Sequence, residues 1–241
     1  MTTGNPTSGE PVVLLSDERA VIDILGKSIL GLWDTVNNLT RLRPTKRERY
    51  RVTIFGSARV EPTHWVYGAV RDTAAELTRL GCDIVTGGGP GLMQAANEGV
   101  KLADPDGTHQ KSVGIRVELP FEQDVNAFVT EAFEHKTFFT RLQHFVLVSD
   151  AFIVTPGGIG TVLETLMVWQ LLQVRHLHDV PLILAGHFWD GLLDWAKAAM
   201  LKPDSPLISP EDLKIPQILP DGPSIVNAIR EHHKQWKARQ G

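Results

Sequence analysis

Three glycine-containing segments are the part of the sequence best suited to bind a small anion. They span residues 56–59, 87–91 and 157–161, and each follows a short apolar run that predicts a buried strand. A helix that starts after such a loop directs free N–H groups toward a ligand, and glycine lets a phosphate approach the backbone closely. We therefore expect the second and third loops to bind a phosphorylated small molecule. The alternative is that the glycines only make tight turns, which we prefer for Gly56 taken alone.

The spacing of these glycines argues against the common nucleotide-binding fingerprints. A Walker A loop ends in Gly-Lys followed by Ser or Thr, and neither longer loop ends that way. The dinucleotide fingerprint G-x-G-x-x-G lacks its last glycine in both, where Leu92 and Leu163 stand instead. A P-loop ATPase and a dehydrogenase are therefore disfavoured. The nine histidines show no HExxH spacing, so no metal site is expected.

Two charged residues near the third loop could carry chemistry. Glu164 lies three residues after Thr161, a spacing that fits a capping box at a helix start. The same position suits a carboxylate at the mouth of a phosphate site, where it could stabilise a cation or direct a water molecule. Arg141 lies on the preceding predicted helix, where an arginine is usually a surface residue. Spacing alone leaves both alternatives open.

The composition is that of an ordinary globular protein. Of 241 residues, 42% are hydrophobic and 22% charged, and the net charge is −4, which argues against whole-chain disorder and against nucleic-acid binding as the main role. The single Cys82 allows no intrachain disulfide and suits a reducing compartment. Because no apolar run could span a bilayer and residues 1–11 lack a signal-peptide core, we expect a cytoplasmic protein without a membrane partner.

Apolar periodicity divides the chain into three parts. Residues 1–15 predict a mobile tail, residues 16–49 an amphipathic helix capped by Ser16 and a basic linker, and residues 50–241 a single domain. Strands and helices alternate in the domain, which predicts an α/β fold with a Rossmann-like doubly wound parallel sheet flanked by helices. Residues 201–223 are expected to be mostly loop. The expected strands are 51–55, 82–86, 111–117, 151–155 and 180–185, and the expected helices are 67–80, 92–102, 138–149, the third loop to about 174, 189–200 and 224–237.

Residues 155–164 contain the complete pattern PGGxGTxxE, which resembles the LONELY GUY (LOG) family. Four further segments are similar to motifs of that family, and together they cover roughly residues 50–200. Characterised members are cytokinin riboside 5′-monophosphate phosphoribohydrolases. The four segments are residues 55–59, 86–99, 118–123 and 138–150.

The resemblance implies two catalytic residues. The family's essential arginine falls on Arg141, and the carboxylate of its glycine-rich pattern falls on Glu164. The residue after the arginine is Leu142, where the family has lysine. Many relatives are described as lysine decarboxylases. We reject that activity here, because decarboxylation of an amino acid normally relies on a pyridoxal Schiff-base lysine and no lysine stands in the three loops.

The expected reaction is hydrolysis of the N-glycosidic bond of a cytokinin or purine nucleoside 5′-monophosphate, giving free base and ribose 5-phosphate. Glu164 would stabilise an oxocarbenium-like state or orient water, and Arg141 would hold the substrate and Glu164. No cofactor is implied. The residues expected to bind substrate and phosphate are Gly56, Ser57, Gly88, Gly89, Gly157, Gly158, Gly160 and Thr161.

The resemblance also implies a homodimer or a higher homo-oligomer. Phe138, Phe139, Leu166 and Trp169 could supply the contact between subunits or could pack in the monomer core. Three other functions stay open. These are a Rossmann module that binds a nucleotide or cofactor without chemistry, an interaction protein that uses the N-terminal helix, and a broad-range nucleosidase for AMP, GMP or pyrimidine monophosphates.

Overall fold

The computed structural model describes residues 17–39, 49–118 and 125–240. The chain divides into two compact units, Met1–Arg47 and Glu48–Gly241. The first unit contains helix α1 (Glu18–Leu39), whose start is capped by Asp17 because its Oδ1 accepts a hydrogen bond from the Ala20 amide at 3.1 Å. The predicted tail and the predicted cap Ser16 lie outside the described residues.

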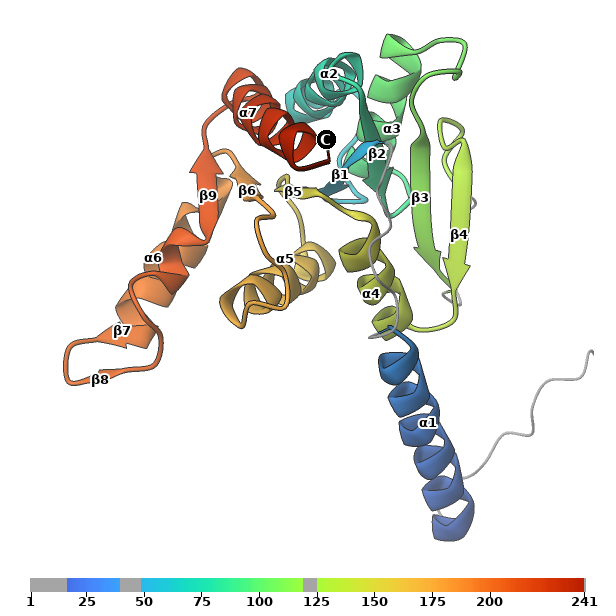
Figure 1. Cartoon of the computed structure of the whole chain (residues 1–241), viewed down its shortest axis with the longest axis vertical. Coiled ribbons are helices and arrows are strands. Elements are labelled where there is room, and N and C mark those ends of the chain that lie inside the picture. Colours follow the sequence, from blue (N-terminus) through green and yellow to red (C-terminus); the bar gives the residue numbers. More distant parts are fainter. Residues whose placement is uncertain (1–16, 40–48, 119–124, 241) are drawn as a thin grey trace, which may run out of the picture. The chain divides into compact units, whose positions relative to one another are not determined.

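The second unit is built on a seven-stranded parallel sheet with the order β4-β3-β2-β1-β5-β6-β9 (Figure 1). This confirms the expected α/β class and parallel sheet. All five expected strands form, with their ends within two residues of the expected positions, and β4 and β9 are added at the two edges. The strands are β1 Tyr50–Phe55, β2 Cys82–Thr86, β3 Ser112–Val117, β4 Glu131–His135, β5 Ala151–Val154, β6 Leu182–Ala185 and β9 Pro216–Leu219.

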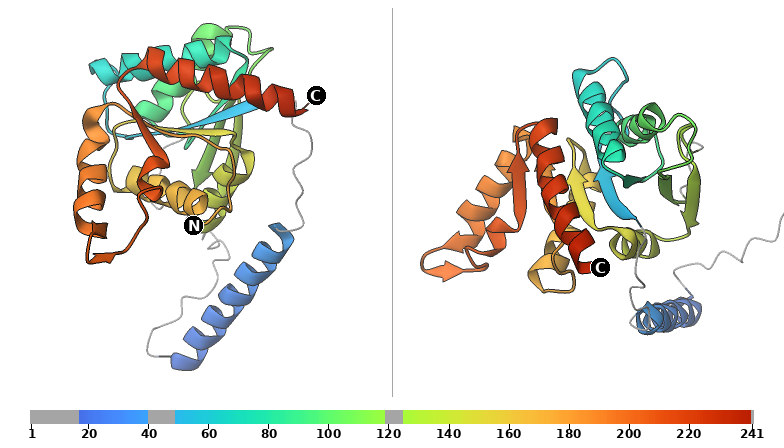
Figure 2. Two further views of the ribbon diagram at one scale, coloured as in Figure 1. Left: turned by 60° about the vertical axis from the view of Figure 1, so that its left-hand side comes forward. Right: turned by 45° about the horizontal axis from the view of Figure 1, so that its top comes forward.

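Helices cover both faces of the sheet (Figures 1 and 2). One face carries α2 (Trp65–Arg79), α3 (Leu92–Ala103) and α7 (Gly222–Gln240), and the other carries α4 (Phe138–Val148) and α5 (Ile159–Gln173). Among the described residues, no helix is long and apolar enough to cross a bilayer. The remaining elements are η1 (His187–Trp189), α6 (Asp190–Met200), the short strands β7 (Leu201–Lys202) and β8 (Ser205–Pro206), and η2 (Asp212–Lys214).

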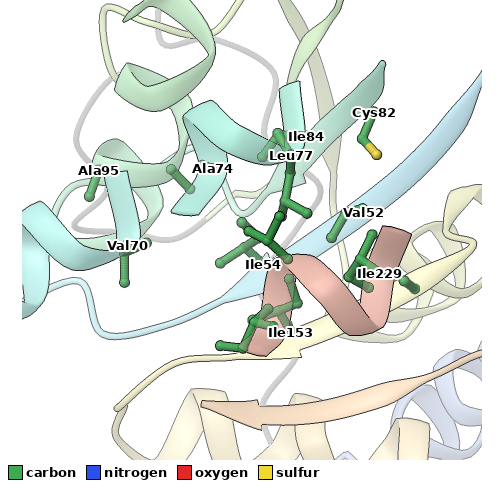
Figure 3. Packing of buried hydrophobic residues seen from close by; sticks show 14 of the residues in the cluster. Val52, Ile54, Val70, Ala74, Leu77, Cys82, Ile84, Ala95, Ile153 and Ile229 are labelled. Atoms are coloured by element: carbon green, nitrogen blue, oxygen red, sulfur yellow. The ribbon is translucent and has the colours of Figure 1, made fainter. Parts of the chain in front are cut away.

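The two cores follow from the alternation of side chains along each strand. In β1, Val52 and Ile54 are buried in the cluster that also holds residues of α2, α3 and α7. Figure 3 shows these two side chains among those that β5 and α2 contribute. Phe55 belongs to the opposite cluster, where its ring centroid lies 5.0 Å from that of Phe145 on α4. Both faces of the sheet are therefore closed by apolar contacts.

Chain order places a crevice at the centre of the sheet. From β1 the chain moves outward through β2, β3 and β4, then returns to β5 on the other side of β1. Phe55 pairs with Val154, so the chain leaves both strands at the same level in opposite directions. Loops that follow such a pair diverge and leave room for a ligand at the carboxyl edge.

Helices α2 and α3 pack most closely at Gly99. A Cβ atom at Gly99 would overlap backbone atoms of Arg71 and Ala75, whereas one at Gly68 on α2 would meet nothing within 4 Å. We expect Gly99→Ala to lower the free energy of unfolding by about 1–3 kcal/mol. Gly68→Ala should raise it by about 0.5–1 kcal/mol, because alanine restricts the unfolded chain. Urea unfolding of both variants tests this, and a neutral Gly99→Ala would contradict the close packing.

Candidate active site

A cleft of about 750 Å³ opens at the carboxyl edge of the sheet, beyond β1, β2, β3 and β5. All three glycine-containing loops contribute to its wall, together with the end of β3 and the first turn of α4. Ligands bind at this edge in open α/β sheets. The lining residues are Gly56, Ser57, Ala58, Arg59, Gly87, Gly89, Pro90, Met93, Arg116, Val117, Phe138, Arg141, Gly158, Ile159, Gly160, Thr161 and Glu164.

An ion pair between Arg141 and Glu164 lies in this cleft. Arg141 comes from α4 and Glu164 from α5, and Nη1 of the arginine lies 3.0 Å from Oε1 of the glutamate. The side chains are only 13% and 11% exposed, so both charges have lost most of their water. A desolvated pair in a cleft is typical of a functional site. Arg141 is therefore not an ordinary surface residue.

Contacts from several elements fix the Arg141 guanidinium. Its Nε donates to the Ile115 carbonyl oxygen of β3 at 2.8 Å, and its Cζ lies 5.1 Å from the centroid of the Phe145 ring. Gly87 leaves space for the same group, since a Cβ atom there would clash with Nη2 of Arg141. These contacts orient the guanidinium, which a positioning role requires.

Burial raises the pKa of Glu164 to about 7, and the neighbouring Arg141 opposes this rise. Burial acts because a carboxylate loses hydration in the cleft wall, while the guanidinium favours the charged form. A carboxyl group with a pKa near 7 exchanges a proton easily at neutral pH. Glu164 could therefore act either as a carboxylate or as a proton donor.

The start of α5 corrects the capping-box interpretation of Glu164. Helix α5 begins at Ile159 with Gly158 as its N-cap, so Thr161 lies inside the first turn and cannot cap the helix. Glu164 lies one turn further on, where its carboxylate pairs with Arg141. Because Gly158 has no side chain to accept from the first N–H groups, those donors are available to an anion in the cleft.

At position 157 of the third loop, there is room for glycine only. A Cβ atom at Gly157 would overlap the side chain of Thr161, which is buried against it. Gly157 itself does not line the cleft, whereas Thr161 does. Glycine at position 157 therefore lets the first turn of α5 come into close contact with the preceding loop.

A buried polar network holds the second loop. Thr86 accepts a hydrogen bond from the Gly88 amide at 2.9 Å and donates to Asn97 at 2.8 Å. The Asn126 side-chain amide reaches the Gly88 and Gly89 carbonyl oxygens at 3.1 and 3.0 Å. These hydrogen bonds within the protein hold the backbone of the second loop in place.

Ser57 connects the first loop to the other two. Its N–H donates to the Pro156 carbonyl oxygen at 3.1 Å, and its carbonyl oxygen accepts from the Leu92 amide at the start of α3 at 2.8 Å. The N-cap of α3, Gly91, also provides no side-chain hydrogen bond. Two helix starts without side-chain caps, those of α3 and α5, thus belong to the loops of one cleft.

The family assignment rests on a match over residues 93–229, to the family described as "Possible lysine decarboxylase". The match covers more than half of the chain and includes the third glycine loop, Arg141 and Glu164. The chain belongs to this family, which is the LOG family.

Curated relatives of this LOG-family chain are named as enzymes. It is 30% identical to a probable cytokinin riboside 5′-monophosphate phosphoribohydrolase of Oryza sativa subsp. japonica, over 76% of this chain and 84% of that protein. It is 28% identical to a cytokinin riboside 5′-monophosphate phosphoribohydrolase of Arabidopsis thaliana, over 79% and 87%. A pyrimidine/purine nucleotide 5′-monophosphate nucleosidase of Escherichia coli strain K12 is also 28% identical, over 56% of this chain but only 30% of that enzyme.

Solved structures agree on the fold. A molybdenum cofactor carrier protein from Chlamydomonas reinhardtii superposes with a TM-score of 0.56 at 15% identity, over 78% of this chain and 99% of that one. The molybdenum cofactor binding protein from Rippkaea orientalis gives 0.55 at 18% identity, over 78% and 98%. At these identities the likeness concerns the Rossmann-like architecture alone.

Most of the predicted site residues meet in the cleft of the LOG-family chain. Gly88 and Gly157 do not line it but belong to the loops that do. Leu142, which replaces the family lysine, is buried in α4 and is absent from the lining, so this departure adds no group to the cleft. The predicted residues in the lining are Gly56, Ser57, Gly89, Arg141, Gly158, Gly160, Thr161 and Glu164.

Sequence reasoning did not identify two further cations in the cleft. Arg59 is the last residue of the first glycine loop and Arg116 stands near the end of β3, and both line the cleft together with Arg141. Arg59 lay within a recognised motif, but nothing in the spacing of Arg116 indicated a site. Among the described residues, no group of three or more His, Cys, Asp or Glu side chains could hold a metal ion.

The raised pKa of Glu164 predicts a pH-dependent stability. The folded chain holds this proton more tightly than the unfolded chain, so the ionised carboxylate destabilises the fold as pH rises from about 4.5 to about 7. Glu164→Gln removes that effect. We expect the variant to match wild type at pH 4.5 and to exceed it by about 3 kcal/mol at pH 8.

Urea unfolding at both pH values measures the difference. Glu211→Gln is the matched control, because Glu211 is exposed and its removal should give the same small effect at both pH values. A Glu164→Gln variant that loses stability relative to wild type as pH rises would contradict the assignment.

Proposed function

We propose that this LOG-family protein hydrolyses the N-glycosidic bond of a nucleoside 5′-monophosphate, releasing free base and ribose 5-phosphate. The observation that carries the proposal is the buried Arg141–Glu164 ion pair, which lies in the same cleft as the start of α5, a helix start without a side-chain cap. The names of the curated relatives support the same reaction class.

The 5′-phosphate is assigned to the first turn of α5. Backbone N–H groups there have no side-chain cap, and the helix dipole favours negative charge at that end. Thr161 adds a hydroxyl donor in the same turn, and Arg59 and Arg116 add positive charge to the wall. Binding the phosphate at a distance from the scissile bond positions the sugar and contributes to lowering the barrier.

We assign to Glu164 the position beside the anomeric carbon of the substrate ribose. Departure of the base leaves an oxocarbenium-like ribose, which an adjacent carboxylate stabilises. Water adds to the anomeric carbon, the C–N bond breaks, and the proton lost by water balances the one gained by the departing base. Arg141 keeps the carboxylate in place and is the positioning partner of Glu164.

Decarboxylation, the activity in the family description, receives no support from the cleft. That chemistry normally needs a lysine for a pyridoxal Schiff base. Arginines, not lysines, supply the cations among the described lining residues. A guanidinium stays protonated and cannot serve as that amine.

A product assay tests the proposed reaction. Purified protein is incubated with AMP, GMP, CMP and isopentenyladenosine 5′-monophosphate, and with the matching nucleosides, and free base is measured by chromatography. We expect base release from monophosphates only. Glu164→Gln should lower turnover at least about 1,000-fold while still binding the monophosphate. Arg141→Lys keeps the charge but cannot hydrogen-bond to Glu164 and the Ile115 carbonyl oxygen as the guanidinium does. It should lower turnover at least about 100-fold.

Glu76→Gln, on the exposed surface of α2, is the control variant and should match wild type. Base release by Glu164→Gln at the wild-type rate would reject the catalytic role. Calorimetric binding of monophosphates without release from any of them would favour the non-catalytic binding module instead. Comparable release from AMP, GMP and CMP would assign the broad-range nucleosidase, whereas a preference for the isopentenyl substrate would assign the cytokinin enzyme.

We also propose that the protein acts as a homodimer in the cytoplasm. Large apolar side chains are exposed on α4 and α5, on the same face of the sheet, and Phe138 and Ile159 also line the cleft. This apolar patch consists of Phe138, Phe139, Ile159, Leu163 and Leu166. An apolar patch beside a functional cleft favours a contact between subunits. Trp169 is no part of it, since its indole donates to the Asp212 carbonyl oxygen and the ring packs in the monomer. The buried Cys82 thiol suits a reducing compartment.

Sedimentation velocity tests the dimer. Phe139, 73% exposed on α4, is the most exposed aromatic residue of the patch, so Phe139→Ser should weaken association at least about 30-fold. Trp195→Ser on α6 is the control, because Trp195 is also exposed but lies on another helix. A wild-type monomer at all accessible concentrations would contradict the proposal.

A further inference from the structure

A second pocket of about 570 Å³ lies at the same edge of the sheet and shares no lining residue with the cleft. Ile54 of β1 and Ile153 of β5 belong to its wall, with Val66 and Val70 of α2 and Ile225 of α7. Figure 3 shows Ile54, Val70 and Ile153 in one cluster. These side chains belong to the core face that α2, α3 and α7 cover, whereas Arg141 and Glu164 come from the helices on the other face.

The depth of this pocket separates it from an ordinary surface patch. Ile54 and Ile153 are each 1% exposed, so the wall reaches the hydrophobic core itself. Contact with such a wall requires a small molecule or an inserted side chain, because a flat protein surface does not reach it. The volume falls within the roughly 300–1,000 Å³ of small-molecule sites.

Five polar side chains of the wall each make one hydrogen bond within the protein. Thr73 donates to Ala69 and Thr155 to Phe55, while Asp221 accepts from Ser224, His64 accepts from Val66, and His187 pairs with Asp190. The buried part of the wall is mostly apolar and is formed by Ile54, Val66, Val70, Ile153 and Ile225. A hydrocarbon-rich ligand therefore matches this wall better than a sugar, phosphate or nucleobase.

Two large aromatic residues complete the lining. Trp65 is 77% exposed and Phe188 is 57% exposed, although both belong to the wall of an apolar pocket. Aromatic side chains favour flat aromatic partners by offset stacking or edge contact. An occupant with an aromatic ring would remove much of this apolar surface from water.

We propose that this pocket is a binding site for a small, uncharged, hydrocarbon-rich aromatic molecule, separate from the reaction cleft. The site stands independently of the proposed hydrolysis, because none of its lining residues takes part in that reaction. Its wall nevertheless includes Thr155 and Pro156, and Pro156 accepts the Ser57 amide of the first glycine loop.

The test uses the full-length protein and indole as the probe. Binding is followed by calorimetry and by NMR of isoleucine methyl groups. We expect saturable binding of indole, with shifts at Ile54, Ile153 and Ile225. Adenine tests a polar flat ring and benzoate a charged one, and each should bind at least about tenfold more weakly than indole.

Ala69→Trp fills the pocket from α2 and should weaken indole binding at least about tenfold. Ala198→Trp on the exposed surface of α6 is the matched control and should bind like wild type. Thermal unfolding verifies that both variants fold. The methyl shifts in wild type provide a readout that does not depend on either variant.

Several results would overturn the proposal. One is the absence of saturable indole binding to wild type, and another is equal binding of benzoate or adenine. Displacement of indole by AMP would place the probe in the reaction cleft instead. If Ala69→Trp changed the sedimentation coefficient and wild type bound no indole, the pocket would be a contact between copies of the chain.

Discussion

The buried ion pair of Arg141 and Glu164 is the constraint on which the site depends. Two charges withdrawn from water are costly unless each keeps a partner with good geometry. Here the arginine has three partners, namely Glu164, the Ile115 carbonyl oxygen and the Phe145 ring. The glutamate relies on the arginine, and its pKa of about 7 shows that the pair compensates only part of its desolvation. Incomplete compensation leaves a carboxylate that gains by approaching a developing positive charge.

The order of the helices and strands explains how the two members of the ion pair come together. The arginine lies on the helix before β5 and the glutamate on the helix after it, so one strand separates the two partners along the chain. Because α4 and α5 cover the same face of the sheet, the two side chains can meet on that face. The glycine loops complete the arrangement, since Gly87 makes room for the guanidinium and the start of α5 offers free N–H groups. The ion pair and the anion site therefore share α5.

Apolar runs in the sequence predicted the five central strands of the sheet but not the two edge strands, β4 and β9. The five central strands are apolar and buried, but β4 has mostly exposed side chains and β9 begins with Pro216, which an edge strand tolerates. The glycine loops were predicted from composition, whereas the pairing of Arg141 with Glu164 came only from family resemblance, because spacing cannot show that two helices meet. The capping-box alternative failed for a similar reason, since it depends on where α5 begins.

The two pockets at one sheet edge follow from the alternation of side chains in the central strands. In β1 and β5, Ile54 and Ile153 face one core, while Phe55 and Val154 face the other. On the first side, the strand ends meet the aliphatic side chains of Val66, Val70 and Ile225, so an apolar pocket results. On the second side, they meet Arg141, Glu164 and the first turn of α5, so the cleft is charged. Between them runs the segment of Thr155 and Pro156, which hydrogen-bonds to the end of β1 and to Ser57. The end of one strand thus separates two pockets with opposite chemistry.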